Sequence, residues 1–258
     1  MITGTVIVLF FIFVAVFAEQ LAPYDPHALG IPYLKPSPEH LLGTNDVGQD
    51  IFSEMIFGTR VSLLIGVFTA VITTAIATCF GLLAGYYRGI ADQLITGLTN
   101  IALSIPGLAL TTLLVAYLKP GKTSLILAIS ITAWTGTARV LRAKVIQLCQ
   151  LPFIKIEKTL GVRDIVIMVK HLIPNLKDII LTRMAMSVSS AMMAEAGLSF
   201  LGLGEYGEKS WGSTLHYAFH MNGVIRGYTW WYLPPILCTS LAVMGFMLIG
   251  YYGAKRRN

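Results

Sequence analysis

The sequence predicts an all-α membrane protein with six transmembrane helices. Three observations support this fold class. The 258 residues are 55% hydrophobic and only 12% charged, and the mean hydropathy of +0.70 lies outside the usual range for soluble domains. Apolar runs long enough to cross a bilayer alternate with polar segments. Lysine and arginine concentrate beside these runs, which is typical of the cytoplasmic flanks of membrane helices.

The charge and the cysteine content argue against other classes of protein. A net charge of +6 could suggest nucleic-acid binding, but the basic residues flank apolar runs, and the positive-inside rule explains them better. We therefore expect no nucleic-acid partner. The cysteines are an odd number and widely spaced, which fits small core residues and not a disulfide or zinc framework. They are Cys79, Cys149 and Cys238.

The first predicted span covers residues 2–18. It is short, but it lacks a basic start and a convincing small-residue cleavage site, so we interpret it as an anchored helix and not a secretory signal. Residues 19–58 are acidic and rich in proline, which disfavours continuous helix, and we predict a long extracellular loop there. The end of this loop, residues 50–57, alternates apolar and acidic residues in the manner of a helix at the membrane interface.

Five further spans follow along the chain. Their predicted ranges are 60–87, 93–118, 123–138, 179–203 and 229–252. The basic segment 139–177 separates the fourth span from the fifth, and we place it in the cytoplasm. Alternation of sides then puts both termini in the cytoplasm, with twelve of the 19 lysines and arginines inside. Residues 1–258 form a single transmembrane domain with no room for a separate soluble domain.

The cytoplasmic segment contains a short helix with exposed apolar residues. Pro152 suits the first turn of that helix, and Gly161 sits where a left-handed C-terminal cap is expected. Pro174 is expected to end the apolar pattern that follows, just before the fifth span. The apolar residues recur at nearly helical spacing and predict a surface for docking a partner protein. They are Phe153, Ile154, Ile156 and Leu160.

The predicted spans carry few ionisable groups. Between the ends of the spans, only the fifth contains any, Arg183 and Glu195. Twelve helical residues separate these two by about 18 Å, too far for direct pairing. We expect Arg183 to reach the cytoplasmic interface. Glu195 is either a functional acid or a structural hydrogen-bond partner of a neighbouring helix. The chain has no P-loop pattern, so nucleotide hydrolysis is not assigned to it, and we predict no catalytic residue or cofactor.

One face of the fifth span is a candidate pathway. Methionine-rich surfaces adapt to varied partners, although packing of small residues between helices explains the same composition. The candidate pathway residues are Met186, Ser189, Ser190, Met193 and Glu195. His216 and His220 have the spacing of zinc ligands on a helix, but no third ligand is evident nearby, and we predict no metal site.

Several motifs resemble a known family. The segment Lys155-Ile-Glu-Lys-Thr-Leu-Gly161, followed after nine residues by His171-Leu-Ile-Pro-Asn175, resembles the cytoplasmic EAA loop of binding-protein-dependent ABC permeases. The C-type permease subunits of the branch that imports dipeptides, oligopeptides and nickel are similar in further motifs. These are His40-Leu-Leu-Gly-Thr-Asn-Asp-Val-Gly-Gln-Asp50, Gly81-Leu-Leu-Ala-Gly-Tyr-Tyr87 and Glu195-Ala-Gly-Leu-Ser-Phe-Leu-Gly-Leu-Gly204. Where the family has Glu-Ala-Ala, this sequence has Lys155, Ile156 and Glu157.

The resemblance implies a type I ABC importer permease fold with a cytoplasmic coupling helix. It also implies a homologous permease, two ABC ATPase subunits and an extracellular solute-binding protein as partners, in a bacterial cytoplasmic membrane. ATP hydrolysis would reside on the ATPases, so the chain itself is not expected to be an enzyme. The residues expected to contact an ATPase are Phe153, Ile154, Lys155, Ile156, Glu157, Leu160, Gly161, Arg163 and Pro174.

The expected cargo is a dipeptide or oligopeptide, with nickel or a metal–chelate complex as the alternative. Two other classes of function stay open at this point. The first is a self-contained secondary carrier or channel, in which residues 139–177 are a mere linker. The second is a membrane metalloenzyme built on His216 and His220.

Overall fold

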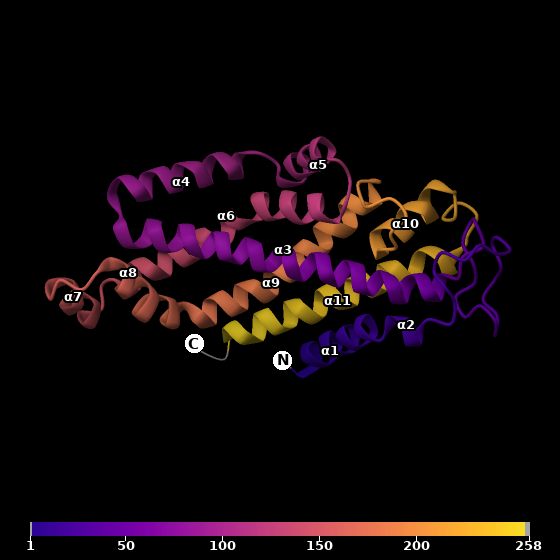
Figure 1. Ribbon diagram of the computed structural model, residues 1–258, viewed down its shortest axis with the longest axis horizontal. Helices are drawn as coiled ribbons and strands as arrows, with labels where there is room; N and C mark the ends of the chain where they lie inside the picture. The colour runs from indigo at the N-terminus through magenta and orange to yellow at the C-terminus, as the bar shows by residue number, and fades with distance from the viewer. Residues whose placement is uncertain (1, 256–258) are drawn as a thin grey trace.

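The computed structural model describes residues 2–255, and these are helical apart from connecting segments, with no β-strand. Arg256 and Arg257, part of the basic tail expected in the cytoplasm, lie outside the described residues. Most helices run along one axis (Figure 1). The helices are α1 (Ile2–Val16), α2 (Ala18–Leu21), α3 (Ile51–Tyr87), α4 (Gly89–Ser104), α5 (Gly107–Leu118), α6 (Lys122–Leu148), α7 (Pro152–Thr159), α8 (Asp164–Val166), the π-helix η1 (Ile167–Leu172), α9 (Ile173–Phe200), α10 (Trp211–His220) and α11 (Thr229–Lys255).

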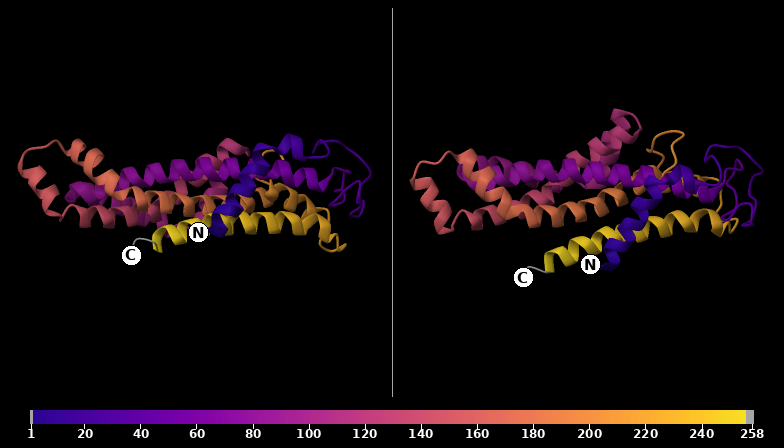
Figure 2. Two further views of the ribbon diagram at one scale, coloured as in Figure 1. Left: turned by 90° about the horizontal axis from the view of Figure 1, so that it is seen from below. Right: turned by 60° about the horizontal axis from the view of Figure 1, so that its bottom comes forward.

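Helix α7 lies at one end of the molecule, and the segment 22–50 lies with α10 towards the other (Figures 1 and 2). We call these the α7 end and the α10 end. Helices α1 and α11 run side by side along one flank, where a Cβ atom on Gly4 would lie 2.8 Å from the Gly245 carbonyl oxygen.

Among the described residues, three helices are long and apolar enough to cross a membrane. They are α3, α6 and residues 229–253 of α11, and a fourth span is added if α4 and α5 are counted together. Helix α1 has only 15 residues, and α9 is longer but contains Lys177, Asp178, Arg183 and Glu195. Length and composition therefore support a multi-pass membrane protein but do not by themselves establish six spans.

The predicted third span, residues 93–118, is not one straight helix. Helices α4 and α5 meet at an angle of 88°. The break falls at Ile105 and Pro106, where Ile105 is extended with ψ of 131°. Proline disfavours helical backbone at the residue before it and cannot donate a backbone hydrogen bond itself.

Two predicted loops are shorter than expected. Helix α3 begins at Ile51 and not at Arg60, because the Asp50 carboxylate accepts a hydrogen bond from the Ser53 amide at 2.8 Å and caps the helix. Helix α6 continues to Leu148 instead of ending near Ala138. Its added residues, 139–148, are mostly good helix formers, and a helix need not end where the membrane does. Arg142 lies in this extension and donates from Nη2 to Asp92 of α4 at 2.6 Å.

Helix α3 packs closely against α6, α9 and α10. A Cβ atom on Gly85 would lie 2.6 Å from the Cβ of Val145 on α6. A Cβ on Gly66 would lie 2.5 Å from the Met192 side chain on α9, and one on Gly58 would approach Trp211 of α10 to 3.0 Å. Small residues let membrane helices approach one another closely, so these glycines determine how near the neighbouring helices lie.

The α3–α6 contact gives a test of this packing. We expect Gly85→Ala to lower the free energy of unfolding by about 1–3 kcal/mol, because the added methyl group would overpack the contact with Val145. The measurement is thermal unfolding of the purified protein in detergent. Gly97→Ala on α4 is the control, since nothing lies within 4 Å of a Cβ there and alanine favours helix. Equal melting temperatures for the two variants would contradict the packing account.

Candidate functional site

Helix α7 has the start and end that its sequence predicts. Pro152 occupies the first turn, and Gly161 adopts the left-handed conformation with φ of 74°. The Val162 amide donates to the Glu157 carbonyl at 3.1 Å, and the Gly161 amide donates to the Lys158 carbonyl at 3.1 Å. This pair of hydrogen bonds is a Schellman motif, which satisfies the last carbonyls of a helix.

The apolar residues of α7 divide between two faces. Phe153 is 42% exposed, Ile156 is 58% exposed and Leu160 is 75% exposed. Ile154 is 0% exposed and belongs to the same core cluster as Leu141 and Leu172. The expectation that Ile154 is an exposed docking residue is therefore wrong, because a short helix lying against the bundle buries one of its sides. The exposed apolar surface of α7 consists of Phe153, Ile156 and Leu160.

Polar contacts hold α7 against the neighbouring helices. Glu157 Oε1 lies 3.0 Å from Nε2 of His171 on η1, and the Lys158 ammonium lies 3.9 Å from the centre of the Tyr86 ring at the end of α3. The Tyr86 hydroxyl donates to Asp164 of α8 at 2.6 Å. Lys155 and Arg163 are exposed. Helix α7 is therefore attached to both α3 and η1.

Pro174 does not end a helix, which corrects the expectation from sequence. Helix α9 follows η1 without interruption, and Pro174 lies in its first turn. A proline has no amide hydrogen for the preceding turn, and its ring crowds the carbonyl four residues earlier, here that of Lys170. The wider π-helical turn over 167–172 accommodates both effects.

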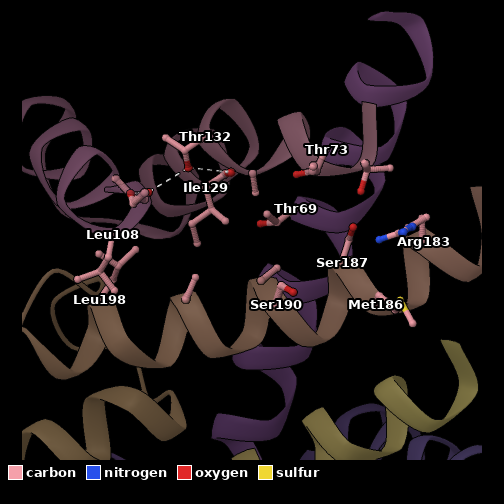
Figure 3. A pocket seen from close by; sticks show the side chains of 17 residues that line it. Thr69, Thr73, Leu108, Ile129, Thr132, Arg183, Met186, Ser187, Ser190 and Leu198 are labelled. Carbon is pink, nitrogen blue, oxygen red and sulfur yellow. Dashed lines mark hydrogen bonds between the residues drawn. The ribbon is translucent and has the colours of Figure 1, made fainter. Parts of the chain in front are cut away.

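A cavity of about 340 Å³ lies between α3, α5, α6 and α9 (Figure 3). Hydroxyl groups and small or apolar side chains make most of its wall, and Arg183 is the one charged residue among the described lining residues. The lining consists of Thr69, Thr73, Gly107, Leu108, Thr111, Ile129, Thr132, Ala133, Gly136, Thr137, Arg183, Met186, Ser187, Ser190, Ala191, Ala194 and Leu198.

The candidate pathway residues do not all reach this cavity. Met186 and Ser190 line it. Ser189 instead donates to the Val243 carbonyl of α11 at 3.0 Å. Met193 is 57% exposed but lies outside the lining. The cavity therefore uses one face of α9, and the methionines and serines of the predicted pathway are spread over more than one face.

Glu195 lies on another side of α9, against α3. It is 1% exposed. Ser199 donates to its Oε1 at 2.8 Å, and Ser62 of α3 donates to its Oε2 at 3.1 Å. This geometry favours the second of the two alternatives for Glu195, a structural hydrogen bond that joins two helices. It leaves Glu195 outside the cavity lining.

Sequence reasoning missed Thr69 and Thr73 and placed Arg183 at the interface instead of in the cavity. The two threonines are four residues apart, so they share a face of α3, and this spacing could have indicated a polar stripe within an apolar span. Thr111 and Thr132 add a second pair, with hydroxyl oxygens 3.0 Å apart. Nothing in the sequence shows which helix these faces meet.

A polar network at the α10 end was also missed. The Lys209 ammonium lies 2.7 Å from Glu54 Oε1 and donates to Gln49 Oε1 at 2.6 Å. Asn45 donates to the same Glu54 oxygen at 2.9 Å. Burial raises the pKa of the nearby Asp46 above its ordinary value. The network joins the segment 22–50 to α3 and to the segment before α10.

The rings of His216 and His220 stack with centroids 4.1 Å apart. The Nδ1 atom of His216 forms a hydrogen bond of 2.7 Å with the Phe200 carbonyl oxygen. Within residues 2–255, no group of three or more histidine, cysteine, aspartate or glutamate side chains is arranged to hold a metal ion.

Comparison with known proteins identifies relatives over most of the chain. The family model for the binding-protein-dependent transport system inner membrane component matches residues 77–256. A dipeptide transport system permease protein of Bacillus subtilis (strain 168) is 32% identical over 96% of this chain and 78% of the relative. A glutathione transport system permease protein of Pectobacterium atrosepticum is 34% identical over 94% of this chain and 81% of the relative.

The solved structures include the inward-facing MetNI methionine ABC transporter. One of its chains superposes with a TM-score of 0.61 at 14% identity, covering 80% of this chain and 96% of that chain. At this level of identity the likeness shows a shared fold.

The hydrogen bonds of Glu195 predict a graded response to substitution. We expect Glu195→Gln to keep most transport, because an amide of the same shape still accepts from one of the two serines. Glu195→Ala should lower the free energy of unfolding by about 1–3 kcal/mol, since Ser62 and Ser199 would lose their partner. Uptake in vesicles and thermal unfolding measure the two effects. Loss of transport in a stable, assembled Glu195→Gln variant would instead show that the charge itself is needed.

Proposed function

The chain belongs to the binding-protein-dependent inner-membrane component family and is a permease of an ABC importer, and from this we propose that its cargo is a dipeptide or oligopeptide. The similarity to a dipeptide permease and a glutathione permease supports peptides as the cargo class. The cavity carries the proposal, because its seven hydroxyl side chains can bond peptide amide groups while its apolar side chains accept varied residues. Permeases of this family are not themselves enzymes.

We place six spans in the single transmembrane domain, residues 1–258. They are α1, α3, the bent pair α4–α5, α6, α9 and α11. The basic segment 139–177 supports placing the α7 end in the cytoplasm. Both termini are then cytoplasmic, and the acidic segment within residues 19–58 is extracellular, in a bacterial cytoplasmic membrane.

Helix α7 is our candidate for the coupling helix that receives an ABC ATPase subunit. Its exposed apolar side chains support this role, because Phe153, Ile156 and Leu160 would be covered by a partner's groove. Lys155 and Arg163 are exposed and could set the charge of the contact. Glu157 and Pro174 would act indirectly, since Glu157 holds α7 to η1 and Pro174 lies at the start of α9.

In the mechanism we propose, a homologous permease faces the cavity and completes the pathway. A solute-binding protein delivers cargo at the α10 end. Closure of the two ATPases would move α7, and η1 would transmit that motion to α9 because the helices are continuous. Alternating access then follows from movement of the two permeases against each other.

The proposed orientation is tested by accessibility of single cysteines. In a background where Cys79, Cys149 and Cys238 are replaced by alanine, we expect Tyr206→Cys to react with an impermeant maleimide in intact cells. Leu160→Cys should react only after the membrane is opened. Both positions are exposed in the permease, at 95% and 75%, so in cells that lack the partner ATPases a difference in labelling reports sidedness and not burial. Labelling of position 160 in intact cells would reverse the orientation.

Coupling is tested by changing the exposed surface of α7. We expect the double variant Ile156→Asp, Leu160→Asp to stay in the membrane but to lose the ATPase and peptide import. Burying an anchor residue at an interface typically contributes about 1–4 kcal/mol to the free energy of binding. An aspartate in its place would lose this contribution, and burial of its carboxylate would weaken binding further. Gly161→Val should also weaken ATPase binding and import, because a side chain in the left-handed backbone region costs about 1–2 kcal/mol and would distort the end of α7. Co-purification of the ATPase and uptake in vesicles are measured together.

The control is Ile225→Asp, which places one aspartate at an 84% exposed apolar residue of the α10 end. It should retain the ATPase. Ile154→Asp should instead destabilise the permease itself, because Ile154 is part of the core. If the α7 variants keep both the ATPase and import, α7 is not the coupling element.

A further inference from the structure

Arg183 brings an isolated positive charge into the cavity. Figure 3 shows its guanidinium directed toward Ser187 and the cavity, at the end away from Leu108 and Leu198. Among the described residues, no carboxylate lies within 4.0 Å of it, whereas Glu54, Glu157 and Asp92 each pair with a basic side chain. An intramembrane cation is costly and ordinarily faces a partner or a water-filled cavity. The charge of Arg183 is therefore available to a ligand.

Two buried hydroxyl groups of the same cavity also lack partners. Thr69 is 1% exposed and Thr73 is 2% exposed, and neither Oγ1 atom makes a hydrogen bond within the described structure. Figure 3 shows both side chains at the cavity wall across from Ser187 and Ser190. A buried polar group ordinarily has a hydrogen-bond partner. These threonines therefore point, independently of Arg183, to a polar occupant of the cavity.

We propose that Arg183 binds the terminal carboxylate of the peptide during its passage, an inference that rests on the proposed function. A guanidinium matches a carboxylate with two parallel hydrogen bonds. The exposed Ser190 can bond an amide group of the peptide, and Thr69 and Thr73 stand in the wall across from it. The carboxylate then lies at the end of the cavity nearer α7, and the amino-terminal residue points toward Leu198.

The length of the cavity and the lack of a carboxylate among its described lining residues agree with this orientation. Arg183 and Leu198 are fifteen residues apart on α9, which corresponds to about 22 Å, enough length for a short extended peptide. Glu195 does not compete for the guanidinium, because it lies outside the lining and accepts from Ser62 and Ser199. The end near Leu198 contains Leu108 and Ala194 and has no charge among its described residues, so it suits an uncharged side chain.

The orientation of the peptide is tested in the complete transporter, reconstituted with its partner permease, ATPases and binding protein. Two dipeptides carry a photoreactive phenylalanine, one at the carboxyl-terminal position and one at the amino-terminal position. We expect the first to label residues around Arg183 and Ser187, and the second, whose position lies about 4–7 Å further along an extended chain, to label residues nearer Ser190. In Arg183→Gln the two probes should give the same distribution of label.

Uptake of a dipeptide with a free carboxylate provides the second readout. We expect Arg183→Gln to lower the uptake rate about tenfold, the change that loss of one hydrogen bond to a charged group produces. Arg183→Lys should recover part of it, because the charge returns without the bidentate geometry. Lys177→Gln removes a positive charge from an exposed position on the same helix, outside the lining, and should leave uptake unchanged.

The outcomes separate this inference from the proposed function. If the unaltered transporter takes up neither dipeptides nor oligopeptides, both fail. If it takes up dipeptide but the two probes label the same residues, or Arg183→Gln equals the unaltered transporter, the carboxylate site alone is overturned. A loss of uptake in Arg183→Gln with the labelling positions of the two probes preserved would assign Arg183 a structural or lipid-contacting role and would also overturn it.

Discussion

The close approach of three helices to α3 is the constraint on which the rest of this structure depends. In lipid, every backbone polar group must be satisfied within the protein, and the packing of helices relies on van der Waals contact because lipid tails are as apolar as the side chains. Gly58, Gly66 and Gly85 place this contact at three levels of α3. Larger residues at these three positions would push away α10, α9 and α6 respectively. The cavity, which lies between α3, α5, α6 and α9, would then lose its shape.

Because α3 is held at three levels, its polar side chains have fixed positions as well. Ser62 bonds Glu195 of α9, Thr69 and Thr73 face the cavity, and Tyr86 bonds Asp164 beside α7. One helix thus connects the α10 end, the cavity and the α7 end. The threonines can stay unpartnered in an apolar span because the surrounding contacts, and not their own hydrogen bonds, fix α3.

The sequence predicted the helical membrane class, the family and the local form of α7, because hydropathy, basic flanks, Pro152 and Gly161 act over short distances. It did not predict the 88° bend after α4, although Pro106 was visible, because proline in a span can kink or break a helix and packing decides which. It could not separate Ile154 from Ile156, since only contact with the core cluster shows which side of α7 is buried. The cavity depends on faces of four helices distant in sequence, so only Met186 and Ser190 of the candidate pathway lie in it.

The two charged residues discussed on α9, Glu195 and Arg183, have different surroundings. Glu195 is bonded to Ser62 of α3, so α9 is attached to the central helix at that level. Arg183 makes no such bond to α3 among the described contacts and lies nearer η1, where motion of α7 would enter the helix. The start of α9 is packed as well, because Leu176 belongs to the core cluster with Leu82 and Leu141, and a Cβ atom on Gly250 of α11 would lie 2.7 Å from Met186. The two residues therefore differ in what their side chains contact and not in how firmly α9 is packed, since Glu195 bonds Ser62 of α3 whereas Arg183 lines the cavity.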